Sequence, residues 1–159
     1  MPELSGRLRA SGRVAILVSR YNELITARLL EGALHCCREA SLSDADVDVL
    51  WVPGAFELVA AGEAAARTRR YSCLIALGAV VRGETPHFDF VAGETTRGLG
   101  EIVLRHGIPV GFGLLTVDDM AQAKDRAGGK AGNKGHEAAE AALRTADLLS
   151  QMGSDGVRA

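Results

Sequence analysis

Cys73–Val81 (CLIALGAVV) and the stretch that follows it, Arg82–Asp89 (RGETPHFD), decide the fold. The first stretch carries no charge and is too short for a buried helix, so it predicts a strand covered on both faces. In the second stretch, Thr85 and Pro86 predict the N-cap and the first residue of a helix. A buried strand that leads straight into a helix is typical of a parallel sheet with helices packed against it.

The same alternation of short apolar runs and helical patterns fills most of the chain. Three other runs predict buried strands: Arg13–Ser19, Val47–Val52 and Pro109–Thr116. Helices are predicted from Asn22 to about Cys37, over Glu57–Thr68, from Pro86 to about Arg105, from Asp118 or Asp119 to about Arg126, and from the glycine-rich turn Gly128–Gly135 to near Met152–Gly153. This alternation implies an α/β fold with a parallel sheet, right-handed crossovers and helices on both faces.

Composition excludes several classes of function. The net charge is −2 and aromatic residues make up only 4% of the chain, which argues against a nucleic-acid surface. No apolar run approaches the roughly 20 residues that span a bilayer, and Met1–Arg13 lacks the apolar segment of a secretory signal, so a cytoplasmic protein is expected. Residues 13–153 are predicted as one domain, with a segment 1–12 before it and a frayed tail, Ser154–Ala159.

The three cysteines, Cys36, Cys37 and Cys73, are an odd number without C-x-x-C spacing. We interpret them as small buried apolar residues in a reducing compartment. No metal site is expected, because no histidine or cysteine stands at ligand spacing from another.

Two glycine patterns resemble nucleotide-binding motifs but lack their decisive residues. Gly78–Thr85 has the glycine spacing of a P-loop, but Glu84 stands where the phosphate-binding lysine belongs and would repel phosphates. Gly98 and Gly100 lie inside a predicted helix, whereas a dinucleotide fingerprint follows a strand. A generic nucleotide or flavin module is therefore disfavoured.

Ligands of parallel sheets bind beyond the carboxyl ends of the strands, which directs attention to the strand-exit loops. In Arg82–Asp89, Gly83 allows close approach of the backbone to a ligand, and the free N–H groups of the helix beginning at Pro86 favour an anion. His87, in the first helical turn, is a candidate base or proton shuttle. The alternative is that His87 merely caps or packs.

Three other positions are candidates with similarly ordinary alternatives. Glu57, after the helix-start amides of Ala55 and Phe56, can accept two hydrogen bonds from a polyhydroxylated ligand, or it can close a simple turn. Tyr21 can stack on a flat heterocycle while Asn22 hydrogen-bonds, or the pair can be a packed aromatic and a helix cap.

A basic side chain near the end of the chain is a further candidate. Arg126 closes the short predicted helix and can bind a phosphate through two parallel hydrogen bonds, although a solvated surface arginine is the commoner case. Lys134, in the glycine-rich turn, can be equally ordinary, and we assign no role to His35, His106 or His136.

Four stretches in this order resemble the lumazine synthase family: Ser19–Thr26 (SRYNELIT), Trp51–Glu57 (WVPGAFE), Gly78–Asp89 (GAVVRGETPHFD) and Arg126–Gly135 (RAGGKAGNKG). The resemblance covers the chain from about Arg13 to Met152. It implies a flavodoxin-like three-layer sandwich with a four-stranded parallel sheet, and a segment 1–12 that can add a strand to a neighbour's sheet. It also implies a transferase of riboflavin biosynthesis that needs neither cofactor nor metal.

The reaction implied by the resemblance joins two small molecules. These are 5-amino-6-(D-ribitylamino)uracil and 3,4-dihydroxy-2-butanone 4-phosphate, and the products are 6,7-dimethyl-8-ribityllumazine, phosphate and water, the penultimate step of the pathway. Family members form pentamers with active sites between adjacent subunits, and some close into a 60-subunit icosahedral shell. The compact Gly128–Gly135 link favours a shell, and riboflavin synthase is a candidate partner.

By matching position, the resemblance also implies a role for each candidate. Tyr21 would stack on the pyrimidinedione, at a position where phenylalanine or tryptophan is more usual, and Asn22 would lie beside the ring. His87 would transfer protons, and Arg126 would clamp the phosphate. Ala55, Phe56 and Glu57 would contact the ring and the ribityl chain, and Val80 and Val81 would contact the heterocycle through their backbone. Glu84 and Thr85 would give backbone N–H groups to the phosphate. Phe112 and Lys134 would belong to the neighbouring subunit's side of the pocket.

Two other functions remain open from the sequence. A non-catalytic relative could keep the fold and bind riboflavin or lumazine, and a shell protein could be selected for assembly alone. The candidate positions, His87 and Arg126 among them, hold the family's residue type or a similar one, which argues against both as the sole role.

Overall fold

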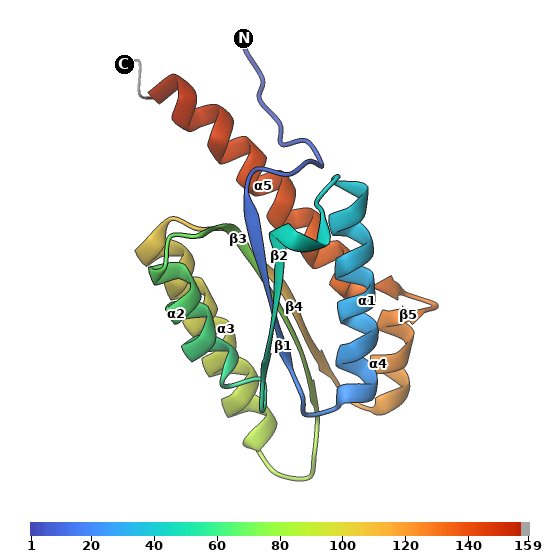
Figure 1. The fold of residues 1–159 in the computed structure, drawn as a ribbon. Helices are drawn as coiled ribbons and strands as arrows, with labels where there is room; N and C mark the ends of the chain where they lie inside the picture. The colour runs from blue at the N-terminus through green and yellow to red at the C-terminus, as the bar shows by residue number, and fades with distance from the viewer. Residues whose placement is uncertain (157–159) are drawn as a thin grey trace.

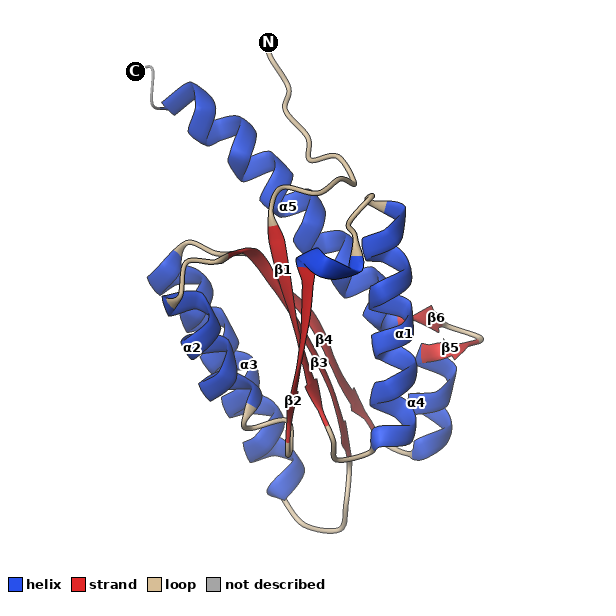
Figure 2. Ribbon diagram, viewed as in Figure 1, coloured by secondary structure: helices blue, strands red, loops and turns tan. Residues whose placement is uncertain are grey.

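A single four-stranded parallel sheet organises the chain in the computed structural model, which describes residues 1–156. The strand order is β2-β1-β3-β4, with β1 paired to both β2 and β3 (Figure 2). The strands are β1 Arg13–Ser19, β2 Val47–Val52, β3 Tyr71–Val81 and β4 Val110–Val117. The helices are α1 Glu23–Glu39, α2 Leu58–Arg67, α3 His87–His106, α4 Met120–Arg126 and α5 Lys134–Gly156, with a 3-10 turn η1 at Asp44–Asp46.

Helices cover both faces of this sheet, so the predicted flavodoxin-like three-layer fold is confirmed. Helices α2 and α3 lie on one face, and α1, α4 and α5 lie on the other (Figure 1). Side chains of β1 alternate between the two layers: Val14, Ile16 and Val18 pack with α1 and α5, whereas Leu17 packs with α2. Both faces are apolar because both are buried, which explains the nearly unbroken hydrophobic runs of the strands.

Most element boundaries agree with the sequence prediction, and the differences have local causes. β1 and β2 match their predicted ranges, and Asp119 caps α4 by accepting a hydrogen bond from the Gln122 amide. Helix α3 begins at His87 with Pro86 as its N-cap, so Thr85 is not the capping residue. Helix α5 continues to Gly156, past the end predicted near Met152 and Gly153. The remainder of the predicted frayed tail, residues 157–159, lies outside the described residues.

The glycine-rich turn contains a small hairpin that the sequence did not predict. Strands β5 Ala127–Gly129 and β6 Gly132–Asn133 pair antiparallel next to α4. Immediately after it, Gly135 lies against α1 so closely that a Cβ atom would stand 1.9 Å from the Leu29 carbonyl oxygen. The turn therefore needs its glycine here for contact between two helices and not only for flexibility.

The three cysteines are buried and free, as predicted. Burial raises the pKa of the Cys36 and Cys73 thiols to about 12 and that of Cys37 to about 11. Among the residues that the structure describes, no helix has the length and apolar character needed to cross a membrane.

The N-terminal segment is tied to α5 through one buried carboxylate. Asp147 is fully buried and accepts hydrogen bonds from the Arg7 amide at 2.7 Å and from Gln151 Nε2 at 2.9 Å, and it pairs with the Arg9 guanidinium. Arg144 of the same helix donates to the Gly6 carbonyl at 3.2 Å. Within one chain the segment thus lies on its own α5, and the pairing of residues 1–12 with a neighbour's sheet stays a prediction.

Asp147→Asn should destabilise the protein in a way that depends on pH. Hydrogen bonds from Arg7 and Arg9 to the Asp147 carboxylate lower its pKa to about 2, below the usual value of about 3.9. Its stabilisation is therefore present above about pH 4 and is lost as the pH falls towards 2. We expect thermal unfolding to show a lower Tm for the variant at neutral pH and a difference from wild type that shrinks over that window.

The matched control is Glu140→Gln, which alters an exposed carboxylate on the same helix that pairs with Arg144. It should shift the Tm little at any pH. A Tm difference for Asp147→Asn that is equally large at about pH 7 and about pH 2 would contradict the role of the charge.

Candidate functional site

The loops after β1, β2 and β3 meet at one end of the sheet and enclose a pocket of about 560 Å³. This volume lies within the usual range for small-molecule sites. The N-terminus and the end of α5 lie at the opposite end of the sheet (Figure 1). We call this pocket of about 560 Å³ the strand-end pocket. Of the residues that the sequence singles out, nine line it: Tyr21, Ala55, Phe56, Glu57, Val80, Val81, Gly83, Thr85 and His87.

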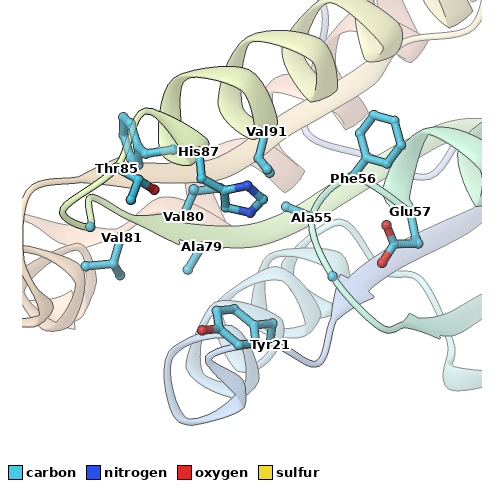
Figure 3. Close-up of a pocket in the computed structure, with 13 residues that line it drawn as sticks. Tyr21, Ala55, Phe56, Glu57, Ala79, Val80, Val81, Thr85, His87 and Val91 are labelled. Atoms are coloured by element: carbon cyan, nitrogen blue, oxygen red, sulfur yellow. The ribbon is translucent and has the colours of Figure 1, made fainter.

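Inside the strand-end pocket, His87 occupies a central position. Figure 3 shows its imidazole pointing into the space between Ala55 and Val80, with the Tyr21 ring across the opening and Glu57 at the side opposite Thr85. The residues Tyr21 and Phe56 are 74% and 57% exposed. Aromatic rings left this open beside a pocket offer flat apolar faces to a ligand or to another subunit.

The turn that presents Tyr21 is held by hydrogen bonds to the neighbouring strands. The Tyr21 amide donates to the Pro53 carbonyl at 2.9 Å, and Asn22 Nδ2 donates to the Ala79 carbonyl at 3.1 Å. Asn22 adopts a left-handed conformation with φ of 62° and makes no side-chain capping bond to α1. Asn22 thus occupies the N-cap position of α1, but its side chain connects the end of β1 to β3 instead of capping the helix.

The loop before α3 is fixed by Arg82. Its backbone amide donates to the Val117 carbonyl at 2.8 Å, and its Nε donates to the Asp118 carboxylate at 3.1 Å. The guanidinium also lies over the Phe88 ring, 4.4 Å from the centroid. These contacts anchor both ends of the segment that carries Thr85 and His87, so these two lining residues are held in a fixed position.

The remaining candidates are not part of the strand-end pocket. Phe112, Arg126 and Lys134 line a separate hollow of about 250 Å³ on β4, an edge strand of the sheet. We call this the β4-edge pocket. It shares no residue with the strand-end pocket, so within one chain Arg126 does not line the same pocket as Thr85 and His87. Glu84 lies on the exposed loop and does not line either pocket.

Four residues of the strand-end pocket were not among the sequence candidates: Gly54, Ala79, Phe88 and Val91. Val91 follows His87 by one helical turn, so helical spacing could have identified it. Ala79 sits within an unbroken apolar run, where nothing marks which side chain faces a cavity.

Fold and pockets together define an α/β protein with a small-molecule site at the carboxyl ends of its strands. The family model described as 6,7-dimethyl-8-ribityllumazine synthase matches residues 11–150. A protein of that name from Clostridium kluyveri is 43% identical over 153 residues, covering 96% of this chain and 99% of the relative. The protein of the same name from Clostridium kluyveri strain NBRC 12016 matches equally well. This chain belongs to the 6,7-dimethyl-8-ribityllumazine synthase family.

Substitutions at Asn22 should separate the cost of its backbone conformation from that of its hydrogen bond. Asn22→Gly keeps the left-handed turn accessible and loses only the bond to the Ala79 carbonyl, at about 1 kcal/mol. Asn22→Ala loses the bond and adds roughly 1–2 kcal/mol of backbone strain. Urea unfolding should therefore rank wild type above Asn22→Gly and Asn22→Ala last. An alanine variant as stable as wild type would refute this role for Asn22.

Proposed function

We infer that this chain is a transferase that condenses 5-amino-6-(D-ribitylamino)uracil with 3,4-dihydroxy-2-butanone 4-phosphate, giving 6,7-dimethyl-8-ribityllumazine, phosphate and water. The observation that carries this inference is the convergence of Tyr21, Glu57 and His87 on one pocket of about 560 Å³. The three residues come from three different strand exits. An aromatic face, a carboxylate and an imidazole suit a flat ring, a polyol and a series of proton transfers.

Each side of the strand-end pocket suits one part of the two substrates. Tyr21 offers its ring face to the pyrimidinedione, and Glu57 offers two carboxylate oxygens to the ribityl hydroxyls. The backbone amides at Glu84 and Thr85, next to the start of α3, suit the phosphate of the second substrate. In this arrangement His87 lies between the ring and the phosphate.

The chemistry then follows from carbonyl–amine condensation. The amine of the pyrimidinedione attacks the ketone to give a carbinolamine, which loses water to form an imine. A proton leaves the carbon next to the imine and phosphate is expelled; the ribitylamino nitrogen then closes the ring, and a second water leaves. We assign these proton transfers to His87. Holding two reactive molecules in register supplies the larger part of the acceleration.

The site is completed by a second subunit. Phe112, Arg126 and Lys134 lie on the β4-edge pocket of the same chain, apart from His87. A head-to-tail ring would bring the β4-edge pocket of one chain to the strand-end pocket of the next. We propose a pentamer of this kind, closed into a 60-subunit shell, located in the cytoplasm and working with riboflavin synthase. The exposed Tyr21 and Phe56 rings support such a contact.

The direct test of the reaction is to mix the purified protein with both substrates and to follow lumazine absorbance and phosphate release. We expect lumazine and phosphate in equal amounts, formed faster than in the uncatalysed reaction. Background turnover by folded, oligomeric protein would overturn the inference. Tight binding of riboflavin or lumazine under those conditions would identify a non-catalytic relative instead.

His87→Ala should lower kcat only moderately, by about 10-fold, which is below the usual contribution of a general acid or base. The reason is that the variant still aligns both substrates, and solvent can carry the protons. The control is His106→Ala, which removes a histidine paired with Glu63 at the far end of the sheet and should leave steady-state rates unchanged. Complete loss of turnover in folded His87→Ala would contradict this account.

Arg126→Ala should mainly weaken capture of the phosphate substrate. Loss of a charge-assisted hydrogen bond pair of about 1.5–3 kcal/mol predicts a KM for the butanone phosphate raised by roughly 10- to 100-fold, with a smaller change for the pyrimidinedione. Lys124→Ala, on the exposed side of α4, is the matched control for the loss of positive charge. Equal KM values for the phosphate substrate in the two variants would exclude the clamp.

A further inference from the structure

A cluster of metal-ligating side chains lies where α1 packs against α5, away from both pockets. Cys36 and Glu39 are three residues apart on α1, and His136 is in the first turn of α5. The ligand atoms of these three side chains all lie within 4.8 Å of one another. None of the three lines the strand-end pocket, so the cluster is separate from the proposed site of reaction.

The exposed fraction of the side chains in the cluster increases from the core towards solvent. Cys36 is fully buried at its floor, whereas the Glu39 and His136 side chains are 45% and 29% exposed. His136 Nε2 lies 2.6 Å from the Glu39 carboxylate, and His35 Nε2 lies 3.7 Å from the same oxygen. His35 is the outermost of the four, with its ring centroid 5.9 Å from that of His136.

This set of donors matches the preferences of zinc. Thiolate, imidazole and carboxylate are its usual protein ligands, arranged as a tetrahedron with bonds of roughly 2.0–2.3 Å. Those bond lengths separate neighbouring donors by roughly 3.5 Å, so closure around an ion requires movement of about 1 Å. The partly exposed Glu39 and His136 side chains have space to make that movement.

We propose that Cys36, Glu39 and His136 bind one zinc ion per chain, with His35 as the fourth ligand. Binding displaces the thiol proton of Cys36 to solvent and replaces the Glu39–His136 hydrogen bond with two bonds to the metal. Glu39 and Glu140 place negative charge near the thiol, while Arg144, which pairs with Glu140, opposes it.

Zinc at this position would cross-link α1 to the start of α5. That start is already connected to α1 through Asn133, whose Nδ2 donates to the Arg28 carbonyl at 3.0 Å. Lys134 of the β4-edge pocket is two residues before His136. The metal is therefore expected to stabilise the folded chain and the glycine-rich turn without taking part in the condensation.

The test uses chelator-stripped, full-length protein titrated with Zn²⁺ by calorimetry, with the Tm measured in parallel. We expect one Zn²⁺ per chain, a Kd of about 1 µM or tighter, and a Tm that rises with zinc. Cys36→Ser and His136→Ala should each weaken binding by about 100-fold or more, and His35→Ala by about 10-fold. The lumazine-forming activity of Cys36→Ser should remain at the wild-type level.

His106→Gln is the matched control, because it removes a histidine that contacts a carboxylate, Glu63, on the other face of the sheet. It should bind Zn²⁺ like wild type. If Cys36→Ser does not fold, Co²⁺ added to the wild-type protein should give a thiolate-to-cobalt charge-transfer band. No binding, binding that His106→Gln weakens as much as His136→Ala, or no such band would overturn the site.

Discussion

The parallel pairing of β1 with both β2 and β3 is the constraint on which the rest of the molecule depends. Leu17 of β1 stands opposite Leu50 on one side and Ala76 on the other. Because parallel strands end at the same edge, this register brings three exit loops together. Tyr21, Glu57 and His87 meet there although they are far apart in the sequence.

The same sheet also explains why the candidate residues fall into two separate pockets. β4 continues the sheet beyond β3, and its outward-facing Phe112 lies with Arg126 and Lys134 on the open side of the molecule. In the proposed ring, a second chain brings its β4 edge to the first chain's strand exits. This contact would cover both the open sheet edge and the exposed aromatic rings. In the proposed ring, activity would depend on assembly, because Arg126 of a neighbour would supply the cation for the phosphate.

Much of the fold and most of the strand-end pocket could be predicted from residues adjacent in sequence. β1 and β2 were predicted to the residue because their β-branched runs end at turn residues, and His87 was found because Pro86 marks a helix start. For Asn22 the sequence leaves a helix cap and another hydrogen bond both open, because only tertiary packing brings the Ala79 carbonyl within reach of its side chain. Cys36 and His136, from two helices, carry no spacing signal, since a tertiary contact alone brings them together.

The central claim, that each site takes one pocket from each of two neighbouring chains, is tested most directly by mixed assemblies. Thr85→Trp fills the strand-end pocket and leaves the β4 edge intact, whereas Arg126→Glu does the reverse. Each variant alone should be nearly inactive. Assemblies made by co-expressing the two in equal amounts should recover about a quarter of wild-type activity, because that share of interfaces combines two intact pockets. Mixed assemblies no more active than the single variants would contradict the account.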